Sequence, residues 1–428
     1  MATAVAVSEA EQAAGTLSEV SLAQLRSDLS IHGFCLLGPG VFPHAVLDRL
    51  GAQMDLFAAQ LAAQEVLDKP GPERYWHLNG GIPRTQPFVH ADVFANPLVE
   101  HAVATLLGPR CFMSFCGGNL NATCAGSGER RRWTRGTSSD TQFLHSDGPF
   151  VFPTPEVAAR AGQPLVHSTT AVVVNFGTSD MTADTGATEI WPGSHLVWPR
   201  WTPTNSRGEV QKGEWPAPTS LEEVASELRQ ARAVPHPVPM AVPKGGCVIR
   251  DIRIWHRGVY NSSPWPRHQI ALCYSADCVR EATIVNSTGL RNLYELPRKP
   301  ESELSCAGGF QPPLAKLQFC ASCNEVFALP SPHGVDRNVQ LVDCGGSIDC
   351  WGKPVATLEV APRRHKGSSG GDADVEWSFL ARASFNHLHA SGATDQCDGT
   401  RRRVREAELP DWALAVFKRE QACAHAKL

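Results

Sequence analysis

The 428-residue sequence contains no apolar run that approaches the roughly 20 residues needed to cross a bilayer. It also lacks an excess of positive charge, since 39 Lys and Arg residues stand against 43 Asp and Glu residues and the formal net charge is -4. A chain with this charge is unsuited to neutralising a phosphate backbone. The segment MATAVAVSEAEQAAGTLSEV has no early Lys or Arg, so it does not match a secretory signal peptide. These absences predict a cytoplasmic protein that associates with neither membranes nor nucleic acids.

The composition is that of a globular protein with a large core, at 42% hydrophobic and 19% charged residues. The 14 cysteines are therefore expected to be reduced thiols, either in the core or as metal ligands. Cys320 and Cys323 have the spacing of a zinc knuckle, and Cys344 and Cys350 could complete a four-cysteine site. The second pair does not repeat the spacing of the first, which favours core thiols over zinc.

The first quarter of the chain has mostly helical patterning. Residues 1–15 are expected to form a flexible N-terminus, and residues 16–66 show a helix–strand–helix pattern in which Gly33 ends the first helix. Another helix is expected at residues 96–108, where the apolar pattern stops before a proline.

Between residues 110 and 280, short β-prone runs alternate with loops rich in Gly, Pro, Ser, Thr and Asn. The runs are CFMSFC, TQFLHSD, TTAVVVNFG, ATEIWPG, GGCVIRDIRIWH and HQIALCYSA. This alternation is typical of an antiparallel sandwich or barrel. Residues 200–240 are expected to form a long insertion, and the pattern weakens after 285. The sequence therefore predicts one mainly β domain at 16–285 with flanking helices, and a C-terminal extension of unknown role at 286–428.

The segment FLHSD places His145 and Asp147 two residues apart. Alternate side chains of a strand point to one face, so the two would project together. An imidazole and a carboxylate on one face can supply two ligands to a metal ion. The spacing alone is a weak signal, and by itself it favours a surface His–Asp pair in a turn.

A second segment, CVIRDIRIWHRGVYNSSPWPRHQIALCYS, carries His256 at the end of a strand and Arg267 at the start of the next. If a hairpin is centred between Asn261 and Ser262, His256 and Arg267 face each other across two strands. A metal-binding His beside an inward Arg would suit an enzyme that holds a dicarboxylate against its metal, because the guanidinium matches a carboxylate. The alternative is a strand-end His at the surface and an exposed Arg.

Taken together, these segments supply two His and one carboxylate in the order His-x-Asp…His. This is the pattern of the facial triad of non-haem iron(II) oxygenases, which leaves open positions on the metal. The nitrogen and oxygen ligands suit iron(II), whereas a thiolate set would indicate zinc.

The sequence resembles the phytanoyl-CoA dioxygenase family of iron(II)/2-oxoglutarate-dependent oxygenases. The matching segments are HSD at 145–147, TGATEIWPGSH at 185–195 and WHRGVYNSSPWPR at 255–267. The opening helix, the GFCLLG strand and the FANPLVEHAVATLLGP helix are also similar to the N-terminal half of the family. The resemblance covers about residues 16–280.

This resemblance implies a double-stranded β-helix, a jelly-roll or cupin-like barrel, with Fe(2+) held by His145, Asp147 and His256. It implies that Arg267 binds the distal carboxylate of 2-oxoglutarate and that Asn175 contacts the same co-substrate, with O2 as the second co-substrate.

Two positions bear on how far the family pattern applies. Gly258 stands where the family often has a Ser or Thr that helps to bind 2-oxoglutarate, so one hydrogen bond is expected to be lost. Asp147 keeps the carboxylate that related halogenases replace with a small residue, which favours hydroxylation or another oxidation over halogenation.

The expected activity is therefore oxidation, with hydroxylation preferred, of a small-molecule substrate, coupled to conversion of 2-oxoglutarate to succinate and CO2. Two other functions remain open. The barrel could be a catalytically silent binding module, in which case it would lack metal or 2-oxoglutarate binding. It could also be a cupin-like isomerase or hydrolase with zinc or manganese, in which case its activity would not need O2.

Overall fold

In the computed structural model, the described residues are 3–68, 74–75, 77–79, 86–121, 131–132, 144, 146–147, 168–196, 236–279, 317–320, 323–337, 339–342, 347–348, 354–355, 362–366, 375–380 and 401–426. His145, Cys344, Cys350 and most of the predicted 200–240 insertion lie outside them.

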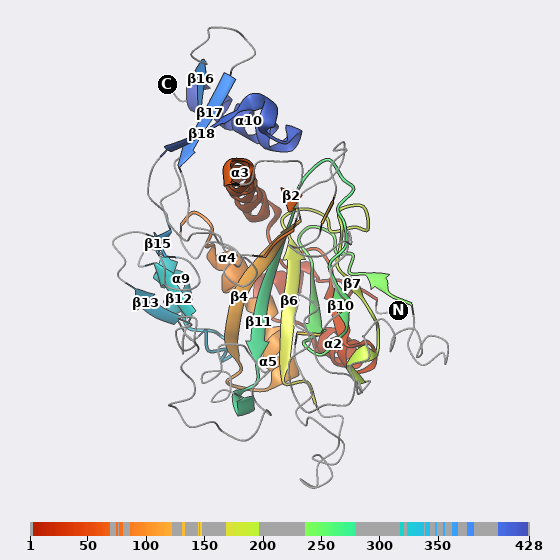
Figure 1. The fold of residues 1–428 in the computed structure, drawn as a ribbon. Coiled ribbons are helices and arrows are strands. Elements are labelled where there is room, and N and C mark those ends of the chain that lie inside the picture. The colour runs from red at the N-terminus through yellow and green to blue at the C-terminus, as the bar shows by residue number, and fades with distance from the viewer. Residues whose placement is uncertain are drawn as a thin grey trace, which may run out of the picture.

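A six-stranded sheet forms the centre of the molecule (Figure 1). Its order is β1-β9-β6-β11-β4-β3, and neighbouring strands are antiparallel throughout. The apolar runs TTAVVVNFG, GGCVIRDIRIWH and HQIALCYSA supply the central strands β6, β9 and β11, as the sequence predicts. The strand bounds are β1 Phe34–Leu37, β3 His77–Asn79, β4 Phe112–Asn121, β6 Ala171–Gly177, β9 Cys247–Asp251 and β11 Arg267–Ser275.

Helices cover one face of this sheet, which is called the outer face below. Val174 of β6 and Leu272 of β11 are fully buried there, in one apolar cluster with Leu25, Leu50 and Val103 from three helices. Those helices are α2 Glu19–His32, α3 His44–Asp68 and α5 Pro97–Leu107. They correspond to the helices predicted at 16–66 and 96–108, so the helical patterning of the sequence identified the layer that covers the sheet.

The predicted helix end at Gly33 is confirmed. Gly33 has φ of 80°, in the left-handed region that favours glycine, and its N–H donates to the carbonyl of Leu29. The chain then reverses directly into β1, which fixes the angle between α2 and the sheet edge.

The described N-terminal residues form a short helix and a contact with the edge of the large sheet. Helix α1 spans Glu9–Ala14 and begins with a capping box between Ser8 and Glu11. Before it, Val5 pairs in parallel with Leu37 at the edge of β1. These caps and this edge-strand contact lie within the described part of residues 1–15, and the flexibility expected for that segment stays a prediction.

A three-stranded sheet of order β10-β7-β8 lies against the other face, called the inner face below. Val248 of β9 packs there with Ile190 of β7 and with Ile254. The fold is mainly antiparallel β with flanking helices, as predicted. Both sheets are open among the described strands, so closure into a barrel stays a prediction. The small sheet consists of β7 Glu189–Ile190, β8 Val238–Pro239 and β10 His256–Arg257.

Part of the predicted C-terminal extension belongs to the core of the main sheet. Phe327 of α9, which spans Asn324–Ala328, packs edge-on to Phe94 with ring centroids 6.3 Å apart. Nearby, the buried Arg337 pairs with the buried Glu100 of α5 at 2.7 Å. Residues 323–337 therefore complete the helical layer.

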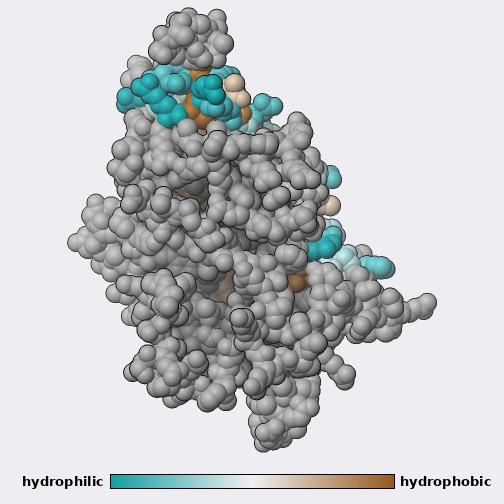
Figure 2. Space-filling model, in the orientation of Figure 1, coloured by the Kyte–Doolittle hydropathy of each residue, from teal (hydrophilic) through white to brown (hydrophobic). Residues whose placement is uncertain are grey.

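The last residues form a small sheet and a helix that pack on α3 (Figure 1). Trp377 and Phe417 are fully buried together with Leu56 and Ala59 of α3. Among the described residues visible in Figure 2, those at this end of the molecule are mostly hydrophilic, with a few hydrophobic ones between them. The elements are β16 Arg363–Lys366, β17 Val375–Leu380, β18 Arg401–Arg405 and α10 Asp411–Ala426.

The remaining short elements are β2 Arg74–Tyr75, α4 Ala91–Phe94, β5 Arg131–Arg132, β12 Leu317–Cys320, β13 Val339–Val342, β14 Ser347–Ile348 and β15 Pro354–Val355. Among the described residues, no helix combines the length and the hydrophobicity that crossing a membrane requires.

Candidate functional site

Polar side chains gather on the inner face of the large sheet. Asn175 of β6 lies opposite Val248 of β9 and Ala271 of β11 in the antiparallel register. Cross-strand partners share a face, and so do residues two apart along a strand. Arg250 and Arg267 therefore face the same side as Asn175. A sheet face that carries two arginines and an amide is built to hold charged groups.

Asp147 and His256 meet on this side. The Oδ2 atom of Asp147 lies 3.4 Å from Nε2 of His256. The His256 side chain is only 7% exposed, whereas that of Asp147 is 36% exposed. The expected strand around Asp147 is not seen at Leu144, Ser146 or Asp147, although Ser146 Oγ donates to the carbonyl of Ile252 at 3.4 Å. That bond attaches the Asp147 segment to the end of β9.

His256 follows a short loop between β9 and β10, and hydrogen bonds between Asp251 and Arg253 hold this loop in place. Asp251 accepts hydrogen bonds from Nε of Arg253 at 2.8 Å and from Nη2 at 2.6 Å, and both residues are buried. Burial by itself raises the pKa of Asp251, but the hydrogen bonds and charge of Arg253 outweigh it and the pKa is lowered. His256 then starts β10, opposite Ile190 of β7.

The hydrogen bonding of His256 fits a metal ligand. Its Nδ1 lies 3.0 Å from the carbonyl oxygen of Ile254, and because a carbonyl only accepts, Nδ1 carries the hydrogen. This leaves Nε2 as the nitrogen for a metal, facing a carboxylate oxygen. Two adjacent ligands about 2.1 Å from one ion lie about 3 Å apart, close to the observed separation. Among the described residues no larger cluster of His, Cys, Asp and Glu could hold a metal, and His145 is outside them.

Arg250 is a site residue that the sequence analysis missed. Its Nη2 donates to Asp147 Oδ2 at 2.6 Å, and its Nε donates to Asn175 Oδ1 at 3.0 Å. The signal was present as an arginine inside the apolar run GGCVIRDI, because an arginine in a fully buried strand needs an internal partner.

Arg267 is buried on the same face and held by the protein. Its Nη1 donates to Gln269 Oε1 and its Nη2 donates to the carbonyl of Gly186, each at 2.7 Å. Burial lowers the pKa of Arg267 to about 10, so the guanidinium is still charged at neutral pH. Arginine has five N–H donors, and its Nε is buried here without a partner. Donors thus remain for a carboxylate.

The glycine that binds Arg267 occupies a site where no side chain fits. Gly186 has φ of 72°, and a Cβ there would lie 2.8 Å from the carbonyl oxygens of Val259 and Tyr260. The glycine of the TGATEIWPGSH segment therefore lets its own carbonyl approach β11.

The predicted hairpin between His256 and Arg267 is wrong. His256 pairs with Ile190 in the small sheet, whereas Arg267 pairs with Asn121 of β4 in the large sheet. The buried Asn261 side chain donates to the carbonyls of Asn121 and Trp265, and this holds the chain as it passes from one sheet to the other. The two predicted residues therefore belong to opposing sheets.

Three further residues from the sequence segments named above have defined environments. Both ends of the Asn175 amide contact protein, since Nδ2 lies 3.5 Å from the carbonyl of Ile270. His195 is buried against the end of α2, with Nε2 3.2 Å from the carbonyl of Ser30, so it packs as a structural residue. Cys323 is buried in the main apolar cluster. The four-cysteine zinc site is not tested, because two of its members lie outside the described residues.

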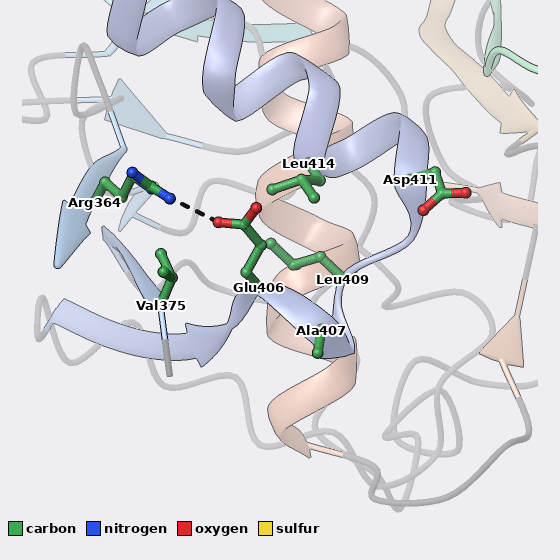
Figure 3. A pocket seen from close by; sticks show the side chains of 7 residues that line it. All are labelled: Arg364, Val375, Glu406, Ala407, Leu409, Asp411 and Leu414. Carbon is green, nitrogen blue, oxygen red and sulfur yellow. Dashed lines mark ion pairs between the residues drawn. The ribbon is translucent and has the colours of Figure 1, made fainter. Parts of the chain in front are cut away.

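A separate pocket of about 320 Å³ lies in the C-terminal part of the chain (Figure 3). Its Glu406 carboxylate already accepts from Trp377 Nε1 at 3.2 Å and pairs with Lys418 at 2.6 Å and Arg364 at 3.7 Å. None of the predicted site residues lines it, so this pocket is distinct from the inner face. It is lined by Arg364, Val375, Glu406, Ala407, Leu409, Asp411 and Leu414.

By its fold, this chain is a mainly antiparallel β protein with helices on one face of its large sheet. The other face carries charged groups that could bind a ligand or a metal. The family model described as Phytanoyl-CoA dioxygenase (PhyH) matches residues 31–269, which is more than half of the chain. The chain belongs to the phytanoyl-CoA dioxygenase family.

Three enzymes are among the solved structures that match part of the chain. SnoN, described as a non-haem α-ketoglutarate-dependent epimerase from nogalamycin biosynthesis, is 16% identical, with 69% of this chain and 94% of SnoN covered at a TM-score of 0.37. SnoK, a carbocyclase from the same biosynthesis, is 15% identical over 61% of this chain and 84% of SnoK, with a TM-score of 0.35. EctD from S. alaskensis, with bound Fe, is 18% identical over 61% of this chain and 77% of EctD, with a TM-score of 0.37. Similarity at this level does not identify the reaction.

Proposed function

We propose that this chain is an iron(II)- and 2-oxoglutarate-dependent dioxygenase that oxidises, and specifically hydroxylates, a small organic substrate. The observation that carries the proposal is the approach of His256 Nε2 to Asp147 Oδ2 at 3.4 Å. Both lie on the side of the sheet that carries the buried Arg250 and Arg267. Membership of the phytanoyl-CoA dioxygenase family supports oxidation with iron and 2-oxoglutarate. The similar solved structures include one with Fe3+ and α-ketoglutarate and one with 2-oxoglutarate.

His145, Asp147 and His256 would hold Fe(2+) through two imidazoles and one carboxylate. When bound, iron, 2-oxoglutarate and O2 supply the oxidation and release succinate and CO2. The hydrogen bond from His256 Nδ1 to the carbonyl of Ile254 keeps Nε2 directed at the metal position.

Arg267 would bind the far carboxylate of 2-oxoglutarate. Its guanidinium is buried, charged and fixed by Gln269 and Gly186 before any ligand binds. A fixed, desolvated guanidinium loses little freedom on binding, and its unused N–H groups match a carboxylate. Asn175 is proposed as a further co-substrate contact. Val173, Ile252 and Cys273 form a small buried apolar cluster, which would restrict water on this face.

The test is conversion of 2-oxoglutarate to succinate by the full chain with Fe(II) and O2. His145→Ala, Asp147→Ala and His256→Ala should each abolish succinate formation. His44→Ala and Asp48→Asn are matched controls, because both side chains are exposed and belong to α3, the helix that covers the outer face. Succinate yields from Asp147→Ala equal to those of the wild type would contradict the proposal. Turnover that persists without O2 would instead favour a cupin-like isomerase or hydrolase.

A further inference from the structure

Arg250 links the carboxylate of Asp147 to the central strand β6. The arginine side chain is 7% exposed, its Nη2 lies 2.6 Å from Asp147 Oδ2, and its Nε lies 3.0 Å from Asn175 Oδ1. Its Nη1 is buried without a hydrogen-bond partner. The direction of the guanidinium therefore depends on the two bonds to Asn175 and Asp147.

The two ends of this linkage differ in burial and in secondary structure. Asn175 is 1% exposed within the seven-residue strand β6, where every residue is buried. Asp147 lies outside any strand and its side chain is 36% exposed. The guanidinium is planar, so fixing Nε by Asn175 also fixes the direction in which Nη2 points. Strand β6 thus fixes the direction of the Arg250 guanidinium, and the guanidinium orients the carboxylate of Asp147.

The positive charge of Arg250 should weaken metal binding at Asp147, whereas its hydrogen bond to Asp147 should strengthen that binding by orienting the carboxylate. A guanidinium beside a metal site repels a cation and draws electron density from the carboxylate. A charge-assisted hydrogen bond also orients a ligand, and loss of such outer partners typically weakens metal binding by about 10- to 100-fold. The two effects predict opposite changes in affinity when the arginine is removed.

We propose that Arg250 is a positioning residue, anchored by Asn175, that holds Asp147 with Oδ2 facing Nε2 of His256. The inference rests on the proposed function, because it takes Asp147 as a metal ligand. It adds to that function a role for Arg250 in orienting Asp147, and a role for the buried Asn175 in orienting Arg250.

Anaerobic calorimetric titration with Co(II) tests the proposal. Arg250→Met should weaken Co(II) binding by about 10- to 100-fold. Arg250→Lys keeps the charge but cannot bond Asn175 and Asp147 in the same geometry, so it should weaken binding by an intermediate factor. Asn175→Ala keeps the arginine and removes its anchor, so it should weaken binding severalfold. Equal or tighter binding by Arg250→Met would overturn the proposal, because repulsion would then outweigh positioning.

Arg337→Met is the matched control. Arg337 is another buried arginine with a carboxylate partner, on the opposite side of the sheet from the site. Its loss should lower thermal stability while leaving Co(II) affinity unchanged. If Arg250→Met does not fold, unchanged affinity in both Arg250→Lys and Asn175→Ala overturns the proposal. Wild-type protein that binds no Co(II) would instead overturn the proposed function.

Discussion

Asp55 of α3 accepts a hydrogen bond from His268 Nε2 at 2.8 Å, which joins the helical layer to the strand that carries Arg267. The His268 side chain is 3% exposed. Arg419 of α10 approaches the other oxygen of the same carboxylate at 3.3 Å. One carboxylate thus connects β11, α3 and the C-terminal helix.

Replacement of Asp55 by Ala should destabilise the protein by about 1–3 kcal/mol, because a buried imidazole N–H would lose its acceptor. Urea denaturation followed by circular dichroism measures the change. Asp48→Ala on the same helix is the control, since Asp48 pairs with Lys244 at the surface and its loss should cost at most about 1 kcal/mol. Equal effects of the two substitutions would contradict the structural role of Asp55.

Phe417→Ala should destabilise the protein by about 3–5 kcal/mol, as expected for an aromatic residue removed from a packed core. Phe417 is fully buried between Trp377 and the apolar face of α3, with the two ring centroids 5.6 Å apart. Val20→Ala, at a side chain that is 82% exposed, should change stability by no more than about 0.5 kcal/mol. A Phe417→Ala protein with wild-type stability would mean that α10 does not pack on α3 in solution.

Arg267→Ala should raise the 2-oxoglutarate concentration needed for half-maximal succinate formation by about 10- to 150-fold, from loss of a charged hydrogen-bond pair worth about 1.5–3 kcal/mol. Arg267→Lys should retain part of the affinity, because it keeps the charge without the fork. Steady-state kinetics with varied 2-oxoglutarate measures both. Arg26→Ala, which removes a half-exposed arginine from α2, controls for the loss of a positive charge. An unchanged requirement in Arg267→Ala would remove this residue from the proposed site.

Glu11 should stabilise the folded protein only above acidic pH. Backbone N–H groups of Ser18 and Ser8 donate to its carboxylate, and these bonds lower its pKa from 4.5 to about 2. A carboxylate whose pKa is lowered by folding contributes its full stability above the unfolded value. That contribution is lost as pH falls from about 4.5 to about 2. The difference in unfolding free energy between wild type and Glu11→Gln should therefore shrink across this window. Glu9→Gln, at an exposed position of the same helix, controls for the charge change; a difference that grows on acidification would contradict the assignment.

The strands and helices with a clear apolar pattern were predictable from the sequence. The apolar runs that form β6, β9 and β11 are nearly continuous, because both faces of these strands are buried, and turn residues bound each run. The helices α2, α3 and α5 have apolar stripes because they cover a sheet, and α2 and α5 end at Gly33 and Gly108. The local sequence pattern was therefore sufficient to predict which segments form buried strands and which form helices with one buried face.

Pairing between sheets was not predictable in the same way. The hairpin assumption joined His256 to Arg267 because the turn signal at Asn261 is local. The register depends instead on Asn121, which is distant in sequence. Arg250 was missed because a single arginine in a strand gives no indication of its partner. The contact with Asp147 arises only when two segments 103 residues apart are brought together.

The packing of residues 323–337 on α5 has a consequence for how the chain folds as it is made. Phe94 and Glu100 are translated long before Phe327 and Arg337, which bury them. A nascent chain that ends before residue 337 therefore exposes an apolar ring and a carboxylate that awaits its guanidinium. We therefore expect a chain terminated before residue 337 to fold less stably and to be aggregation-prone.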